Sequence, residues 1–228
     1  MKKCIFKIHL FGISVFLILL VISCKKEDDD TTVTDIDGNV YNTITIGSQV
    51  WLKENLKTTK YNDGAEIPNV TDNTEWGNLI SGAYSWYENN EATHKNTYGA
   101  LYNWYTVNTG KLCPNGYHIP SDAEWTELSE YLGGTNVAGG KLKEIGTTHW
   151  MTPNTGATNE SRFTALPGGM RSYSGTFNLI TEIGYWWSST QYESPESAYS
   201  RSLGYDSNTF YRHGSNKKNG HFVRCLKN

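Results

Sequence analysis

The residues that could act as general acids or bases form no recognisable catalytic motif. Carboxylates are scattered along the chain, and no spacing singles out two of them as a catalytic pair; examples are Asp122, Glu124, Glu182, Glu193 and Asp206. The histidines do not fall at the H-x-x-x-H or H-E-x-x-H spacing of a metal-binding helix: His94, His118, His149, His213 and His221. A surface or structural role is the favoured interpretation of each histidine. We therefore expect no catalytic residue, no metal ligand and no cofactor.

Aromatic side chains in loops are better candidates for a function. The chain contains 15 Tyr and 8 Trp residues, and Trp, Tyr and Arg side chains can stack on sugar rings or anchor a protein partner. The ligand-binding candidates are Trp86, Tyr87, Trp150, Tyr192, Tyr211 and Arg212. The alternative for each ring is burial, because most rings in a domain this rich in aromatic residues belong to the core. Trp125 and Trp186 are assigned to the core.

The first 23 residues are predicted to be a lipoprotein signal peptide. Three lysines lie within the first seven residues, and an apolar run follows from residue 8 to residue 22. A run of about 15 residues is shorter than the roughly 20 that a membrane-spanning helix needs. Val21-Ile22-Ser23-Cys24 resembles the lipobox of bacterial lipoproteins, in which the cysteine is lipidated and becomes the mature N-terminus. Cys24 is thus the predicted lipid anchor; the alternatives are an ordinary signal peptide and a single anchor helix.

Residues 24–34 are predicted to form a lipidated acidic tether. Glu27 and the three aspartates at 28–30 follow two lysines, and this acidic cluster resembles the surface-export signal of Bacteroidetes-type lipoproteins. The resemblance implies that the protein is anchored in the outer membrane and faces the cell exterior. The alternatives are retention on the periplasmic face and a run of charges that merely keeps the tether solvated.

The remaining residues, 35–228, suit one domain with a core of its own. Removal of residues 1–23 leaves 205 of the 228 residues, and the loss of three lysines changes the formal net charge from −3 to −6. A mildly acidic domain without a basic run argues against nucleic acid as a partner. The many aromatic residues, together with 22 glycines, indicate short strands and turns rather than a helical bundle.

Two cysteines remain once Cys4 leaves with the signal peptide and Cys24 carries lipid. In an oxidising compartment Cys113 and Cys225 are expected to form a disulfide. The loop-entropy model assigns about 4–5 kcal/mol of stabilisation to a bridge that closes so long a loop. A metal site would need more ligands than this pair offers, and a free reactive cysteine is the remaining alternative.

Two elements carry clear local signals. Ser121 and Glu124 form the pattern of a helix capping box, and apolar residues recur on one face up to Leu132, before two glycines end the helix. Residues 40–51 alternate as expected of a β-hairpin with Gly47-Ser48 at its bend. A second short helix is predicted over 137–145, whereas 88–96 and 147–162 are predicted to be polar loops. Residues 98–105 carry aromatic side chains at both odd and even positions, so their periodicity does not distinguish a strand from a helix.

Several motifs together resemble those of the Fibrobacter succinogenes major paralogous domain. They are 51–56 (WLKENL), 98–104 (YGALYNW), 113–125 (CPNGYHIPSDAEW), 166–169 (LPGG), 185–190 (YWWSST) and 223–225 (VRC). The resemblance extends in one order over residues 35–228. Members of this family are typically found on secreted or surface proteins.

The helix start at 120–125 is also similar to that of the formylglycine-generating, sulfatase-modifying-factor group. This resemblance implies an α+β, C-type-lectin-like fold: two short helices, a small irregular antiparallel sheet, long loops and one disulfide. In those enzymes both cysteines of the redox-active pair lie late in the domain. In this chain only Cys225 lies there, so we do not expect formylglycine-generating activity. The sugar-binding tripeptides of C-type lectins are also absent from the sequence, so no calcium site is expected.

Three functional hypotheses follow. The leading one is a surface-anchored, non-catalytic domain that binds a glycan or a protein. The second is a structural or adhesive lipoprotein without a discrete ligand site, and the third is an enzyme of unknown class. A contiguous patch of exposed aromatic residues would favour the first hypothesis over the second. A cleft that gathers titratable groups with perturbed pKa values would favour the third.

Overall fold

The computed structural model describes residues 31–228, so the predicted signal peptide and Cys24 lie outside the described residues. The folded part begins before the predicted boundary at residue 35, because Thr32–Thr34 form a strand that pairs with residues 40–42. Val33 packs against the core, which explains why this segment belongs to the domain and not to the tether. None of the helices in residues 31–228 has the length and hydropathy of a membrane-spanning segment.

Two five-stranded sheets build the fold. The first contains, in spatial order, β1 (Thr32–Thr34), β2 (Val40–Ile46), β3 (Gln49–Leu52), β12 (Leu226–Lys227) and β6 (Tyr117–His118). The second contains β11 (Tyr211–Asn216), β10 (Ser197–Gly204), β9 (Ile183–Gln191), β7 (Gly168–Arg171) and β8 (Phe177–Ile180). A separate ladder joins β4 (Tyr84–Ser85) to β5 (Leu101–Tyr102). These strands pair antiparallel except β7 and β9, which run parallel.

The expectation of two short helices is wrong. Residues 31–228 contain α1 (Asn73–Asn78), the 3-10 helix η1 (Tyr87–Asn89), α2 (Glu91–Tyr98), α3 (Trp104–Val107), α4 (Asp122–Tyr131) and α5 (Thr135–Leu142). Helix α2 lies in a segment predicted to be a polar loop. It begins at the Asn90 cap, whose side chain accepts from the Thr93 amide, and it buries only His94 and Tyr98. So small an apolar face produces no periodic signal in the sequence.

The capped helix and the hairpin are confirmed. The Ser121 hydroxyl accepts from the Glu124 amide, and the Glu124 carboxylate accepts from the Ser121 amide, at the start of α4. Strands β2 and β3 pair across the predicted bend. Helix α5 begins at 135 and ends at 142, earlier than predicted. A side chain at Gly139 would place Cβ 2.4 Å from the Asn208 carbonyl oxygen, so this glycine is required for close packing.

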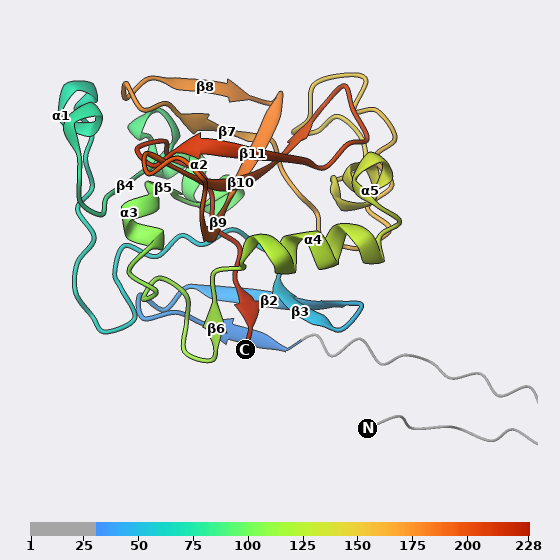
Figure 1. Ribbon diagram of the computed structural model, residues 1–228, viewed down its shortest axis with the longest axis horizontal. Coiled ribbons are helices and arrows are strands. Elements are labelled where there is room, and N and C mark those ends of the chain that lie inside the picture. The colour runs from blue at the N-terminus through green and yellow to red at the C-terminus, as the bar shows by residue number, and fades with distance from the viewer. Residues whose placement is uncertain (1–30) are drawn as a thin grey trace, which may run out of the picture.

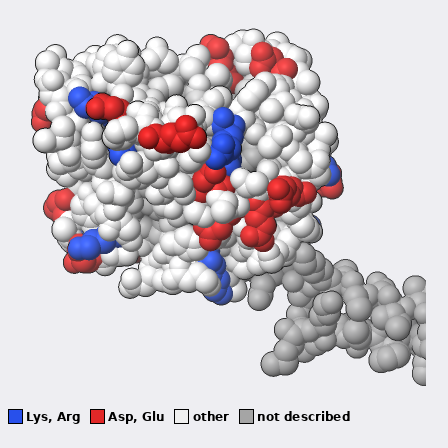
Figure 2. Space-filling view, viewed as in Figure 1, with Lys and Arg blue, Asp and Glu red and all other residues white. Residues whose placement is uncertain are grey.

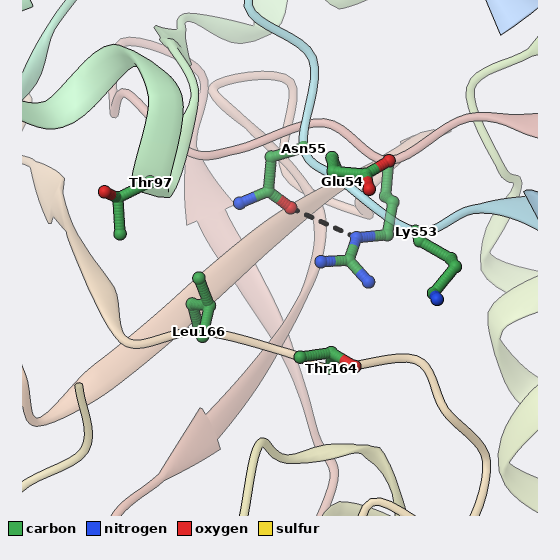
Figure 3. A pocket seen from close by; sticks show the side chains of 7 residues that line it. Lys53, Glu54, Asn55, Thr97, Thr164 and Leu166 are labelled. Atoms are coloured by element: carbon green, nitrogen blue, oxygen red, sulfur yellow. Dashed lines mark hydrogen bonds between the residues drawn. The ribbon is translucent and has the colours of Figure 1, made fainter. Parts of the chain in front are cut away.

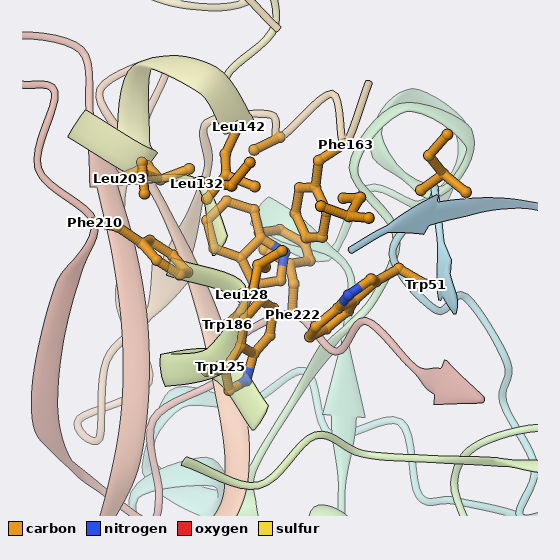
Figure 4. Packing of buried hydrophobic residues seen from close by; sticks show 14 of the residues in the cluster. Trp51, Trp125, Leu128, Leu132, Leu142, Phe163, Trp186, Leu203, Phe210 and Phe222 are labelled. Atoms are coloured by element: carbon orange, nitrogen blue, oxygen red, sulfur yellow. The ribbon is translucent and has the colours of Figure 1, made fainter. Parts of the chain in front are cut away.

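Helix α4 lies between the two five-stranded sheets and joins them through the core (Figure 1). The Trp125 ring lies 4.6 Å from that of Trp51 in β3, measured between centroids, and its Nε1 donates to the Trp187 carbonyl in β9. Figure 4 shows Trp51, Trp125, Phe163 and Trp186 packed in this cluster. Both Trp125 and Trp186 are fully buried, as predicted. A second apolar cluster contains the disulfide between Cys113 and Cys225, which is confirmed.

Candidate ligand-binding surface on the edge strand β11

Strand β11 is the outer strand of the second sheet. It pairs with β10 along one side only, and its first four residues, from Tyr211 to Gly214, are exposed. Successive side chains of a strand point to opposite faces. An edge strand in this position therefore presents two sets of side chains and an unpaired backbone edge.

On one face of β11 the rings of Tyr211 and His213 stack. Their centroids are 5.9 Å apart and their planes differ by 23°. Each ring is held by a hydroxyl: the Tyr211 hydroxyl lies 3.1 Å from Ser207 Oγ, and His213 Nε2 lies 2.8 Å from Ser202 Oγ. Tyr211 keeps 41 % of its surface exposed. The two rings are thus held nearly parallel to each other, with polar groups at their edges, on one face of the strand.

On the opposite face, Arg212 and two tyrosines pack together. The Arg212 guanidinium lies 4.0 Å from the centroid of the Tyr199 ring, and Tyr192 meets Tyr199 edge to face at 4.8 Å. Gly214 lies beneath the Tyr192 ring, where a Cβ would approach a ring atom to 2.7 Å. Tyr211 and His213 on one face, and Tyr192, Tyr199 and Arg212 on the other, flank the unpaired edge of the strand, and we call these five residues the β11 patch.

Asp122, the first residue of α4, fixes the orientation of Arg212. Its carboxylate accepts from Arg212 Nε at 3.0 Å and Nη2 at 2.8 Å, and from Arg201 Nη1 at 2.7 Å. Burial acts to raise the pKa of Asp122, but the hydrogen bonds and charges of the two arginines outweigh it and lower the pKa. Asp122 is therefore ionised at neutral pH and is bound on both sides. This carboxylate positions Arg212 and is not placed to transfer protons.

Three of the six predicted ligand-binding residues lie in this patch: Tyr211 on one face of β11, and Tyr192 and Arg212 on the opposite face. The other three are wrong as candidates for stacking on a ligand, because Trp86, Tyr87 and Trp150 are only 2 %, 4 % and 1 % exposed. The Trp150 indole donates to the Ala165 carbonyl, and the Tyr87 ring packs against that of Phe177. A buried ring offers no free face to a ligand. Their place in loops suggested exposure, but these loops fold back over the core.

Sequence reasoning missed Tyr199 and His213. Both belong to the alternation of β10 and β11, where Tyr199 pairs in register with Gly214 and His213 pairs with Ser200. This pairing places Tyr199 beside Tyr192 and His213 beside Tyr211. The alternation of side chains along each strand can be read from the sequence, but the register in which β10 and β11 pair is set by the folded structure.

The titratable groups away from the patch form separate pairs. His118 Nε2 lies 2.9 Å from Glu124, and His149 Nδ1 lies 2.9 Å from Glu144. Within residues 31–228 no three His, Cys, Asp or Glu side chains are arranged to hold a metal ion. Figure 2 shows that the visible surface is made mostly by uncharged residues, with Lys and Arg or Asp and Glu in small separate groups.

Comparison with known proteins places the chain in a family. The family model of the Fibrobacter succinogenes major domain matches residues 44–227. Searches of curated proteins and of solved structures find no match. The match covers most of the chain and includes the second sheet, α4, the disulfide and the first sheet except β1 and the start of β2. The chain therefore belongs to the Fibrobacter succinogenes major domain family.

Proposed function

We propose that this chain is an outer-membrane lipoprotein, anchored through Cys24 and facing the cell exterior, that binds a glycan without catalysis through the β11 patch. One observation carries the proposal: the exposed Tyr211 ring lies beside His213 on one face of an edge strand, and Arg212 is fixed on the opposite face of the same strand. Exposed rings held on a rigid element can stack on the apolar face of a sugar. Because the ring positions are fixed in advance, little conformational entropy is lost on binding.

The chemistry of the patch favours a neutral ligand. Asp122 binds both Arg201 and Arg212, so it offsets one of their two positive charges and only a single positive charge remains. Ser207, next to the Tyr211 hydroxyl, can donate to or accept from a sugar hydroxyl. The surrounding surface is mostly uncharged (Figure 2). A stacking surface edged by hydroxyl groups suits a neutral saccharide better than a highly charged polymer.

The arrangement of the sheets separates the β11 patch from the end of the domain that would be anchored. The described chain begins at β1, in the first sheet, and β11 lies in the second sheet on the other side of α4 (Figure 1). An anchor that precedes β1 would leave the β11 patch directed away from the membrane. The proposal also includes a C-type-lectin-like architecture for the domain. Its support is the mixture of short helices, irregular strands and one disulfide, with β1 and β12 in one sheet.

A protein ligand is the second candidate, and the unpaired edge of β11 favours it. Strand addition to an exposed sheet edge is a common way of binding an extended peptide. In that case backbone groups of β11 would form most of the hydrogen bonds, and single side-chain changes would weaken binding less than they would for a stacked sugar.

The test is a glycan-array and polysaccharide binding screen with the purified full-length protein in detergent micelles. We expect saturable binding that Tyr211→Ala weakens at least about tenfold, since a stacked aromatic anchor contributes more than 1 kcal/mol. Tyr173→Ala is the matched control, because Tyr173 is 59 % exposed and lies outside the patch. Repeating the screen with EDTA tests for a bound cation. Absence of binding to every glycan would contradict the glycan proposal. It would favour a protein ligand or a purely structural role instead.

Anchoring is tested separately with Cys24→Ser. The unchanged protein is expected in the outer-membrane fraction and to be cleaved by protease added to intact cells, whereas the variant should lose its lipid and leave the membrane. Protection from protease in intact cells, together with cleavage after lysis, would instead place the domain on the periplasmic face.

A further inference from the structure

A small cleft that shares no residue with the β11 patch contains an unusual buried cation. The cleft has a volume of about 220 Å³ and is lined by Lys53, Glu54, Asn55, Thr97, Thr164, Leu166 and Arg224. Its walls come from the segment after β3, the end of α2, the approach to β7 and the segment before β12. Figure 3 shows the labelled side chains around it.

Arg224 is held rigidly at the base of this cleft. Its neighbours Val223 and Cys225 accept backbone hydrogen bonds from Leu56 and Leu52, and Cys225 is also in the disulfide. Arg224 Nε donates to Asn55 Oδ1 at 3.2 Å, the bond drawn dashed in Figure 3, and Nη1 donates to the Phe163 carbonyl. The residue is only 2 % exposed.

The hydrogen bonding of Arg224 is incomplete compared with that of two other buried cations, Lys143 and Arg171. Lys143 Nζ donates to three carbonyl oxygens, and Arg171 donates from Nε, Nη1 and Nη2. Among the described residues, Arg224 Nη2 has no hydrogen-bond partner, and no carboxylate lies within ion-pair distance of the guanidinium. A guanidinium has five N–H groups, so its Nη2 end is available to a ligand. Burial lowers the pKa of Arg224 only to about 9, so it is charged at neutral pH.

The other groups of the cleft complement an anion of single charge. The Lys53 ammonium forms no ion pair or side-chain hydrogen bond within residues 31–228. Glu54 is bound to the Asn42 amide and side chain, both at 2.8 Å, and it offsets one of the two positive charges. One net positive charge suits a carboxylate better than a doubly charged phosphate. Thr164 adopts a φ of +53°, a strained conformation for a β-branched residue, of the kind that gathers at binding sites.

We propose that this cleft binds the carboxylate group of a small organic anion, with Arg224 and Lys53 as its cationic contacts and the Thr97 hydroxyl as a further donor. The volume suits a group the size of one sugar ring or one terminal residue, below the 300–1,000 Å³ typical of drug-sized ligands. Two sources of such a carboxylate are a hexuronic acid and the C-terminus of a peptide.

Isothermal titration calorimetry on the full-length protein in micelles tests the ligand class. The probes are glucuronate with glucose as its neutral counterpart, N-acetylglycine with N-acetylglycinamide, and inorganic phosphate. Saturable binding of either carboxylate, without binding of its neutral counterpart, supports the proposal, and the carboxylate that binds identifies the source. Binding of neither carboxylate, or tighter binding of phosphate than of both, would overturn it.

Variants test the location. Lys53→Met should weaken carboxylate binding about tenfold, because it removes one of two cations, whereas Glu54→Gln should tighten it by removing the opposing charge. Lys57→Met, on the same segment but outside the cleft, is the matched control and should leave the affinity unchanged, as should Tyr211→Ala. Unchanged affinity in both Lys53→Met and Glu54→Gln, in proteins that remain folded, would show that the anion binds elsewhere. Because neither variant changes Arg224, the location of the site can be tested even if Arg224→Met fails to fold.

Discussion

Two of the buried cations, Lys143 and Arg171, are held mainly by carbonyl oxygens rather than by carboxylates. Lys143 Nζ binds the carbonyls of Thr155, Gly204 and Ser207 at 2.9 to 3.0 Å. Arg171 binds those of Val70, Thr71, Asp72 and Gly175. Each side chain ties together irregular segments whose backbone groups would otherwise lie unpaired in the interior. Such residues stabilise loops that have no regular ladder of their own.

His221 makes the stability depend on pH. It is fully buried, its ring stacks on Tyr185 with centroids 5.0 Å apart, and burial lowers its pKa to about 3. The unfolded chain binds a proton near pH 6.5, whereas the folded protein does not do so until about pH 3. Above pH 6.5 the buried neutral His221 therefore costs no stability. As the pH falls from 6.5 toward 3, the free energy of unfolding decreases by at most about 1.4 kcal/mol per pH unit.

Denaturant unfolding at pH 7, 6 and 5 measures this effect. We expect His221→Phe, which keeps a ring beside Tyr185 but cannot be protonated, to lose less stability on acidification than the unchanged protein. His94 and His213, whose pKa values burial also lowers, are present in both proteins and cancel in the comparison. Equal slopes of unfolding free energy against pH in the two proteins would refute the assignment to His221.

At the level of the elements, the cap of α4 is the clearest case of local control. The Ser121 hydroxyl accepts from the Glu124 amide and also donates to its carboxylate. Ser121→Ala removes both interactions, so we expect the free energy of unfolding to fall by about 1 kcal/mol. Ser194→Ala, an exposed serine outside any helix, is the matched control. A loss equal to that of the control would mean that tertiary packing, and not the cap, determines where α4 begins.

The elements that the sequence predicted well are those whose signals are local. The cap, the apolar face and the glycine stop of α4 lie within one segment, and the β2–β3 hairpin is specified by its own bend. Strand β11, which spans Tyr211–Asn216, is an exposed edge strand and has no apolar alternation to mark it in the sequence. The cleft at Arg224 draws on four distant segments, so only the folded chain brings its residues together.

At the scale of the whole molecule, the two sheets have different roles. The first contains both the strand where the described chain begins and the strand near its end, and the disulfide joins the segments that precede β6 and β12 of this same sheet. The second carries the β11 patch on its outer edge. Helix α4 connects them, since its first residue, Asp122, orients Arg212 while Trp125 packs on Trp51. A change in α4 would therefore affect the patch as well as the core.

The disulfide between Cys113 and Cys225 is the strongest long-range constraint on this arrangement. It joins residues 112 positions apart, and closing a loop of that size stabilises the folded state by about 4–5 kcal/mol in the loop-entropy model. The Cys113→Ala/Cys225→Ala double variant should therefore unfold at a clearly lower denaturant concentration than the oxidised protein. Adding reductant should lower the midpoint of the unchanged protein and leave that of the variant unaltered. If the variant instead matched the oxidised protein, the packing around β12 and β3 would suffice to hold the C-terminal segment, and the bridge would be a consequence of that packing.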